Sequence, residues 1–198
     1  MQVDVASGRL AGVRYVESPH QDERPEDCHP ELVIVHGISL PPGEFGGPYI
    51  EQLFTHRLDL EAHPYFRNLA GLRVSSHVLV DRAGKLVQFV PFHRRAWHAG
   101  QSGYFGRTAC NDFSIGVELE GCDEVAYADA QYLRLAELAF ALALAYPGLA
   151  SMRMVGHRDV APGRKSDPGV AFDWLRMDRI LAVARARRRG GPGAGLVA

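Results

Sequence analysis

The sequence predicts a single α/β domain, and three observations lead to that prediction. An unbroken aliphatic run at 32–35 is typical of a strand buried on both faces. β-rich runs at 74–80 and 85–90 flank a short link, as in a hairpin. Apolar residues recur at three- and four-residue spacing from Tyr132 to Tyr146, as in an amphipathic helix. The 198 residues, 46% of them hydrophobic, suffice for one core.

The first strand leads directly into His36, which we expect at the edge of a sheet. Segment 39–48 is too rich in proline and glycine for regular structure, so it is expected to be an irregular loop beside that strand end. Loops in this position often carry substrate contacts. The link at 81–84 ends in glycine, which suits a connection between two antiparallel strands.

A third strand pattern, at 115–120, alternates strictly between apolar and other residues. Its apolar side chains therefore share one face, while Glu118 and Glu120 share the other face with Gly116. Two carboxylates on one strand face are usually solvated. Because neighbouring segments supply potential metal ligands, this face is instead a candidate wall of a cleft.

The helix through Tyr132 and Tyr146 is expected to stop at the Pro-Gly pair that follows, and Asp129 can serve its first turn as a cap or by its charge. A short strand at 152–155 then delivers His157. A final helix, 172–187, is expected to pack through its apolar residues Phe172, Leu175, Ile180 and Leu181. The basic and then glycine-rich segment 187–198 is expected to be a disordered tail, leaving a domain at 1–186.

Charge and cysteine content limit the binding partners and the cellular compartment that can be expected. Twenty-two basic and 23 acidic side chains nearly balance, so no strong field favours nucleic acid or a membrane. The N-terminus lacks the basic start and apolar run of a secretory signal, and a cytoplasmic location is expected. Cys28, Cys110 and Cys122 show no CxxC spacing, which favours free thiols in a reducing compartment.

Three residues are candidate ligands of a zinc ion. His157 and Asp167 lie ten positions apart with proline and glycine between them, and His36 follows another predicted strand. Imidazole and carboxylate suit zinc, and a catalytic zinc site usually has three protein ligands and one open position. The alternative interpretation is two hydrogen-bonded histidines at a sheet edge and a turn aspartate before Pro168.

Two more residues could act beside such a metal. Glu118 suits a general base, although an ordinary exposed strand glutamate would look the same in sequence. Lys165 lies two residues before a candidate ligand, where its charge could stabilise an oxyanion. A solvated loop lysine is the alternative.

Candidate substrate contacts are less specific. Arg73 and Arg107 could each hold a carboxylate, but surface arginines are abundant. Trp97 and His98 could form a platform for a sugar or peptide, or could be a packed tryptophan and a hydrogen-bonded histidine. His77, flanked by valines, is expected to be a structural strand histidine.

Several longer motifs occur together in one order, at 32–36, 38–47, 95–100, 110–121 and 156–169. Over about residues 9–180 the sequence resembles the cytosolic AmpD-type amidases, which are anhydro-muropeptide N-acetylmuramoyl-L-alanine amidases. The resemblance implies a central mixed β-sheet flanked by α-helices, the fold shared with phage lysozyme-type amidases and peptidoglycan recognition proteins.

The resemblance also implies roles for individual residues. It implies Zn²⁺ held by His36, His157 and Asp167, with Glu118 as catalytic acid and base and Lys165 as oxyanion stabiliser. Asn111, within one shared motif, becomes a further expected substrate contact. The implied reaction cleaves the amide between 1,6-anhydro-N-acetylmuramic acid and the L-alanine of a stem peptide during cell-wall recycling. We expect a small muropeptide as substrate and no obligate protein partner.

Two alternatives and two departures accompany this resemblance. An amidase acting on intact peptidoglycan and a non-catalytic peptidoglycan-binding module are the rival functions. Gly37 stands where relatives carry asparagine, and Ala109 where some carry a second arginine. Neither position is a proposed ligand, base or oxyanion group, so we expect effects on substrate affinity and not on the reaction.

Overall fold

The computed structural model describes residues 1–190, with side chains described for residues 1–186. Its helices are α1 (Tyr49–Phe54), α2 (Asp129–Ala145), α3 (His157–Val160) and α4 (Trp174–Gly190), with short 3₁₀ helices η1 (Pro64–Leu69), η2 (Cys110–Asp112) and η3 (Pro147–Leu149). Its strands are β1 (Val3–Asp4), β2 (Arg9–Leu10), β3 (Arg14–Tyr15), β4 (Gln21–Glu23), β5 (Leu32–Ile38), β6 (Val78–Val80), β7 (Leu86–Gln88), β8 (Arg94–Ala96), β9 (Gly103–Tyr104), β10 (Arg107–Thr108), β11 (Ser114–Glu120) and β12 (Met154–Gly156).

A six-stranded sheet with the order β12-β5-β11-β6-β7-β3 forms the centre of the molecule. The pairs β12/β5, β5/β11, β11/β6 and β7/β3 are parallel, and β6/β7 is the antiparallel hairpin predicted from the sequence. The predicted α/β class with a mixed sheet is therefore confirmed. The two longest strands, β5 and β11, lie side by side at the centre, where burial on both faces favours continuous apolar runs.

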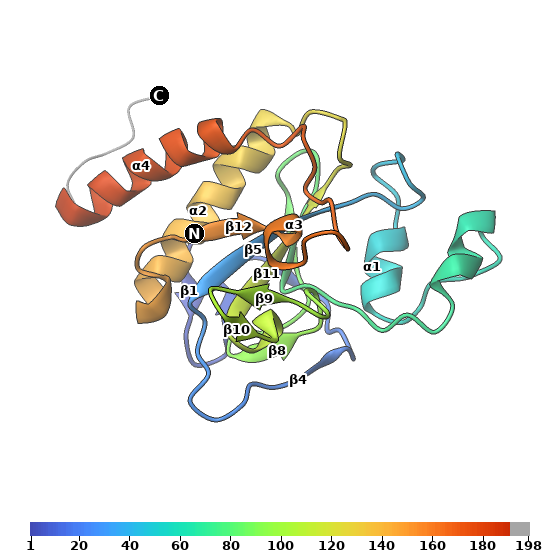
Figure 1. The fold of residues 1–198 in the computed structure, drawn as a ribbon, viewed down its shortest axis with the longest axis horizontal. Coiled ribbons are helices and arrows are strands. Elements are labelled where there is room, and N and C mark those ends of the chain that lie inside the picture. The colour runs from blue at the N-terminus through green and yellow to red at the C-terminus, as the bar shows by residue number, and fades with distance from the viewer. Residues whose placement is uncertain (191–198) are drawn as a thin grey trace.

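Helices cover both faces of this sheet. On one face, Val33, Val35 and alternate residues of β11 pack against the buried faces of α2 and α4, which lie side by side in Figure 1. On the other face, α1 and η1 pack against β6 and β7, while α3 and the segment around η2 cover part of β5. The open part of this second face lies between α1 and α3, at the C-terminal halves of β5 and β11.

The strands differ in length from their predictions. β5 continues two residues past His36 to Ile38 because β11 keeps pairing with it as far as Glu120. The hairpin strands are shorter than the predicted 74–80 and 85–90, and α1 and η1 were not predicted. Segment 39–48 is irregular, as expected, and the Glu120 carboxylate accepts a hydrogen bond from its Gly46 N–H.

The helix ends also needed correction. Of the two roles expected for Asp129, the side-chain cap is wrong, whereas the position of its charge in the first turn of α2 is confirmed; the carboxylate also pairs with Arg176 of α4. In α4, Leu175 is 62% exposed and does not pack, because the buried face passes instead through Met177 and Leu181. The helix continues to Gly190, so 187–190 are helical and not a disordered tail; the rest of the predicted tail lies outside the described residues.

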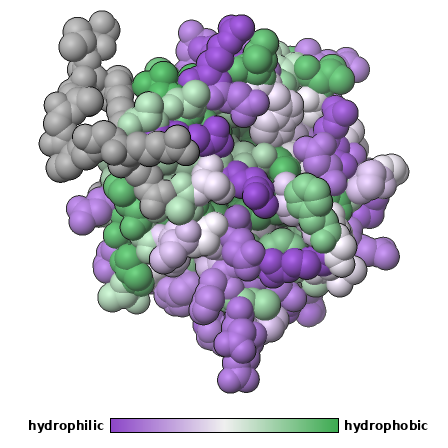
Figure 2. All heavy atoms as spheres, turned by 60° about the vertical axis from the view of Figure 1, so that its left-hand side comes forward, coloured by the Kyte–Doolittle hydropathy of each residue, from purple (hydrophilic) through white to green (hydrophobic). Residues whose placement is uncertain are grey.

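The surface is mixed in character. Figure 2 shows one face on which hydrophilic side chains are spread among smaller hydrophobic groups. Within the described part of the chain, no helix combines the length and apolar composition that a membrane crossing requires. The three cysteines are free thiols, as predicted.

Candidate active site

The three candidate metal ligands converge at the open end of the sheet. His36 comes from β5, His157 from the first residue of α3, and Asp167 from the loop that follows α3. His36 Nδ1 lies 3.0 Å from His157 Nδ1 and 3.2 Å from Asp167 Oδ2, and His157 Nδ1 lies 3.1 Å from the same oxygen. Two nitrogens and one oxygen therefore face a common point.

This geometry fits a tetrahedral zinc ion. Ligand atoms bonded to zinc at about 2.0–2.1 Å and spread at tetrahedral angles lie about 3.3 Å from one another. The observed separations of 3.0–3.2 Å are close to that value. Two imidazoles and one carboxylate are also a donor set that zinc accepts, and three protein ligands leave a fourth position for water or substrate.

Electrostatics keep two of these ligands, His36 and Asp167, in the protonation states that a metal needs. Burial lowers the pKa of His36 to about 4, so the imidazole is neutral near pH 7. Burial alone would raise the pKa of Asp167, but the adjacent His157 and His36 rings hold it well below its usual range. At neutral pH the site therefore offers a neutral His36 ring and an ionised Asp167 carboxylate.

Glu118 lies beside the ligands and is not the exposed strand glutamate of the alternative interpretation. It is 8% exposed, and its Oε2 is buried without a hydrogen-bond partner among the described residues. Burial raises its pKa well above the usual value, and the charge of Asp167 raises it further, whereas Lys165 lowers it. A carboxyl group whose pKa is raised in this way is a candidate for proton transfer during a reaction.

The ligands and Glu118 lie in a cleft of about 870 Å³. Lys165 is exposed at its edge, close enough for its charge to act on both Glu118 and His36. Among the described side chains, none forms an ion pair with its ammonium group. Its positive charge therefore remains available to a group bound in the cleft.

The predicted substrate contacts divide into two groups. Arg73 and Trp97 line the same cleft, and the Trp97 ring stacks on His20 at 5.8 Å between ring centroids. Arg107 does not line the cleft; its guanidinium pairs with Glu31 at 2.8 Å and covers the ring of Phe113. The structure therefore does not bring Arg107 to the site.

His98 and Asn111 line the cleft, but their polar atoms already have protein partners. His98 Nδ1 lies 3.0 Å from His36 Nε2, and Asn111 Oδ1 accepts hydrogen bonds from the backbone N–H groups of His98 and Ala99. His77 is buried and accepts a hydrogen bond from the Gly116 N–H, which confirms its structural role.

Gly37 is closely packed on the side where a side chain would be. A Cβ atom there would lie 2.2 Å from the hydroxyl oxygen of Tyr127, which donates a hydrogen bond to the carbonyl of Pro168. A side chain at this position would meet Tyr127 first, so the missing asparagine is not simply a missing substrate contact. Ala109 is exposed, in left-handed backbone at φ 57° just before η2.

Sequence analysis missed three supporting residues. Tyr127 holds the carbonyl next to Asp167, Arg164 donates to the carbonyls of Ala99 and Gln101, and Ser114 lies behind His98. Arg164 was next to a candidate residue in the sequence. The other two gave no local signal, because their partners are distant along the chain.

Comparison with known proteins agrees with this geometry. The family of N-acetylmuramoyl-L-alanine amidases matches residues 26–170, a span that contains the three candidate ligands, Glu118 and Lys165. This chain belongs to that family. The amidase is 60% identical over 174 residues to the 1,6-anhydro-N-acetylmuramyl-L-alanine amidase AmpD of Escherichia coli strain K12, covering 88% of this chain and 94% of that relative.

Solved structures give the same result for the fold. The amidase superposes on the crystal structure of a selenomethionine AmpD derivative with a TM-score of 0.87 and 56% identity, over 91% of this chain and 99% of the other. It also resembles E. coli AmiD in complex with anhydro-N-acetylmuramic acid-L-Ala-D-γ-Glu-L-Lys, with a TM-score of 0.55 and 27% identity, over 80% of this chain and 60% of the other. The expected resemblance to AmpD-type amidases and the expected enzyme class are confirmed.

Proposed function

We propose that this amidase uses zinc to hydrolyse the amide bond between 1,6-anhydro-N-acetylmuramic acid and the L-alanine of a stem peptide, in cytoplasmic peptidoglycan recycling. The observation that carries the proposal is the convergence of His36 Nδ1, His157 Nδ1 and Asp167 Oδ2 in the cleft that also holds Glu118. The activity named for the AmpD relatives supports this choice of substrate. Three free cysteines are consistent with a reducing compartment.

The donor set supports zinc as the cofactor, with His36, His157 and Asp167 as its ligands. A zinc ion there would supply Lewis acidity toward the carbonyl and toward water. The proposed ligand atoms of all three residues lie within 4.8 Å of one another, which weighs against a non-catalytic binding module. The three residues are held by β5, by α3 and by the loop after α3. Tyr127 stabilises that loop by donating a hydrogen bond to the carbonyl of Pro168.

Glu118 is proposed as the group that moves protons. Its unpartnered Oε2 can accept a proton from the attacking water. Because its pKa is raised, the carboxyl group can keep that proton and then donate it to the alanine nitrogen. Protonation of the nitrogen makes the amine a leaving group, so the C–N bond breaks and the lactyl carboxylate forms. Both halves of the reaction thus use one carboxyl group.

Lys165 is proposed to stabilise the negative charge that develops on the amide oxygen during attack. Its ammonium is exposed at the cleft edge and is not neutralised by an ion pair among the described side chains. A preorganised charge at such a position contributes about 3–4 kcal/mol to lowering the barrier. Arg73 and Trp97, which line the same cleft, are proposed to bind the peptide carboxylates and the sugar.

The test compares soluble anhydro-muropeptide with intact sacculi as substrates for zinc-loaded protein in H₂¹⁸O. The expected products from the soluble substrate are a peptide beginning with L-alanine and an anhydro-muramic acid that carries one ¹⁸O in its lactyl carboxylate. Mass spectrometry locates the label. Label in the peptide instead would place the cleavage elsewhere, and turnover of sacculi alone would favour the rival function on intact peptidoglycan.

A further inference from the structure

A buried line of hydrogen bonds runs away from the cleft behind His36. His36 Nε2 lies 3.0 Å from His98 Nδ1, and His98 Nε2 lies 3.3 Å from Ser114 Oγ. Ser114 Oγ in turn lies 2.5 Å from the carbonyl oxygen of Cys110. His36, His98, Ser114 and Cys110 are all buried, so water does not compete for these contacts.

The last member of the line determines the direction of every hydrogen bond in it. A carbonyl oxygen can only accept, so the Ser114 hydroxyl donates its single hydrogen to the carbonyl of Cys110. Ser114 Oγ is then an acceptor, and the proton in its contact with His98 belongs to His98 Nε2. A neutral imidazole carries one N–H. His98 Nδ1 is therefore an acceptor, and His36 Nε2 must donate to it.

We propose that His98 is a positioning residue that holds His36 in the tautomer protonated at Nε2, with the unprotonated Nδ1 facing the metal position. The proposal rests on the zinc site of the proposed function. In this proposal His98 orients the ligand His36 through a hydrogen bond, and it is not part of the substrate platform that the sequence suggested. Metal-bound histidines commonly donate their second N–H to an outer partner, and losing such partners lowers metal affinity about 10–100-fold.

His157 is held in the same tautomer by the neighbouring residue. Its Nε2 lies 3.2 Å from the carbonyl oxygen of Ala99, which can only accept, so Nε2 carries a proton. The ring atom left to face His36 and Asp167 as a metal ligand is Nδ1. Residues 98 and 99 thus direct both histidine ligands toward one point. Arg164 also donates a hydrogen bond to the Ala99 carbonyl, which helps to hold that oxygen in place.

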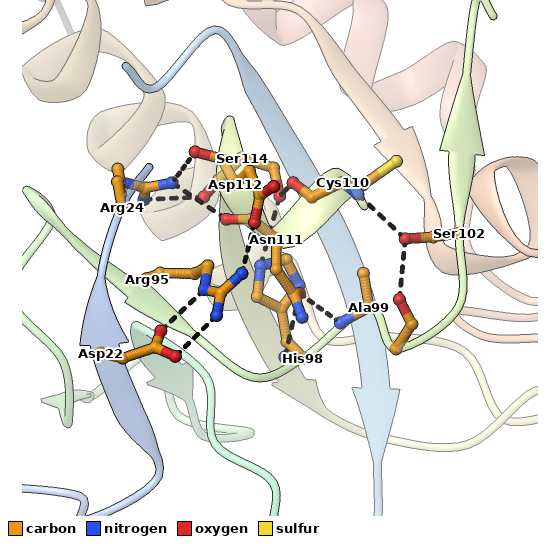
Figure 3. Close-up of polar contacts among 11 residues, drawn as sticks. Asp22, Arg24, Arg95, His98, Ala99, Ser102, Cys110, Asn111, Asp112 and Ser114 are labelled. Carbon is orange, nitrogen blue, oxygen red and sulfur yellow. Dashed lines mark hydrogen bonds and ion pairs between the residues drawn. The ribbon is translucent and has the colours of Figure 1, made fainter. Parts of the chain in front are cut away.

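The 98–99 segment is itself held in place by the protein interior. Asn111 Oδ1 accepts from the N–H groups of His98 at 3.2 Å and Ala99 at 2.8 Å, and Figure 3 shows the two facing segments that these bonds join. Arg24 donates to the carbonyls of Asn111 and Ser114, which anchors the second segment. On the sheet side, a Cβ at Gly116 would lie 2.4 Å from His98 Cγ, so only glycine leaves room for the ring.

The first test is a direct measurement on the zinc-loaded wild-type protein. Long-range ¹H–¹⁵N correlation spectra distinguish the two imidazole tautomers. We expect His36, His98 and His157 each to carry the proton on Nε2. A proton on Nδ1 of His36 would overturn the proposal, and this result does not depend on any variant folding.

The second test is a pair of variants at His98 with zinc affinity as the readout. In His98→Asn, the amide oxygen takes the place of Nδ1 as acceptor, and zinc affinity is expected to stay within about threefold of wild type. In His98→Leu, which has similar bulk but no acceptor, affinity is expected to fall about 10–100-fold. Chelator competition measures both, and circular dichroism checks that each variant is folded.

Equal zinc affinity of folded His98→Leu and wild type would overturn the proposal. So would an equal loss in His98→Asn and His98→Leu, since the role would then be packing. Neither readout uses catalysis. If the wild-type protein binds zinc with the expected tautomers but does not cleave muropeptide, the proposed function fails while the assignment of His98 stands.

Discussion

Glu118 and His36 are register partners on the adjacent parallel strands β11 and β5. Partners in a parallel pair project from the same face of the sheet, and neighbouring strands are about 4.8 Å apart. Their pairing therefore sets the proposed base beside the first proposed ligand at a distance determined by backbone hydrogen bonds. Rigid strands hold such a geometry better than loops do.

Replacing Glu118 by glutamine should abolish turnover but not zinc binding. The Glu118→Gln side chain has nearly the same shape but cannot take a proton from water, so kcat should fall about 10²–10⁴-fold. Steady-state kinetics and zinc titration measure the two effects. Glu120→Gln is the matched control, because Glu120 shares the strand face but binds the Gly46 and Arg82 N–H groups. Similar losses of kcat in both variants would contradict the role of Glu118.

Removing the charge of Lys165 should slow the chemical step. Lys165→Ala is expected to lower kcat about 10²–10³-fold with little change in zinc affinity, because the group acts on charge that develops during the reaction. The chain has one other lysine, Lys85, which is exposed in the β6–β7 hairpin. Lys85→Ala should retain wild-type kinetics. A rise in KM alone in Lys165→Ala would instead indicate a role in substrate binding.

Zinc should stabilise the folded protein through Asp167. Ligands that bind only the folded state raise its stability by RT ln(1 + [L]/Kd), which is about 2.7 kcal/mol at a zinc concentration of 100 Kd. The melting temperature of chelator-treated wild type should rise on adding zinc, whereas that of Asp167→Ala should rise much less. Magnesium at the same concentration serves as the control ion. An equal rise in both proteins would mean that Asp167 is not a ligand.

The raised pKa of Glu118 predicts a pH-dependent cost to stability in the metal-free protein. Between the unfolded-state pKa, about 4.3, and the higher folded-state pKa, the folded protein binds more protons, so the free energy of unfolding falls as pH rises. Glu118→Gln lacks this titration. Its stability relative to wild type should therefore increase from about pH 4 to about pH 7, by about 1.4 kcal/mol for each unit of pKa difference. Urea denaturation at the two pH values measures it; a constant difference would contradict the shift.

Gly116 should be intolerant of even a methyl group. Gly116→Ala would bring Cβ to 2.4 Å from His98 Cγ, so the ring or the strand must move, at a typical cost of about 1–3 kcal/mol. Zinc affinity should fall with the displacement of His98. Gly103→Ala is the control, because the nearest atom to its added Cβ is 3.4 Å away. Denaturant unfolding and chelator competition would reveal whether the two variants differ as expected.

Local patterns in the sequence were enough for the two central strands that carry His36 and Glu118, but not for α3, which carries His157. The run 32–35 and the alternation at 115–120 predicted β5 and β11 because strand side chains follow a period of two. The same alternation separated Glu118 from its apolar neighbours. The exposed face of α4 was misjudged at Leu175, since the position of the apolar stripe depends on what the helix packs against.

The sequence by itself determined the α/β class, the order of the main elements and the chemical types of the site residues, because each of these depends on residues close together in the chain. Only the tertiary structure decided which residues meet. The parallel register of β5 and β11 sets Glu118 opposite His36, and contacts across 62 residues bring His98 behind that ligand. Parallel pairing and buried hydrogen bonds join distant segments, so no local pattern records that His98 faces a ligand and Arg107 faces away.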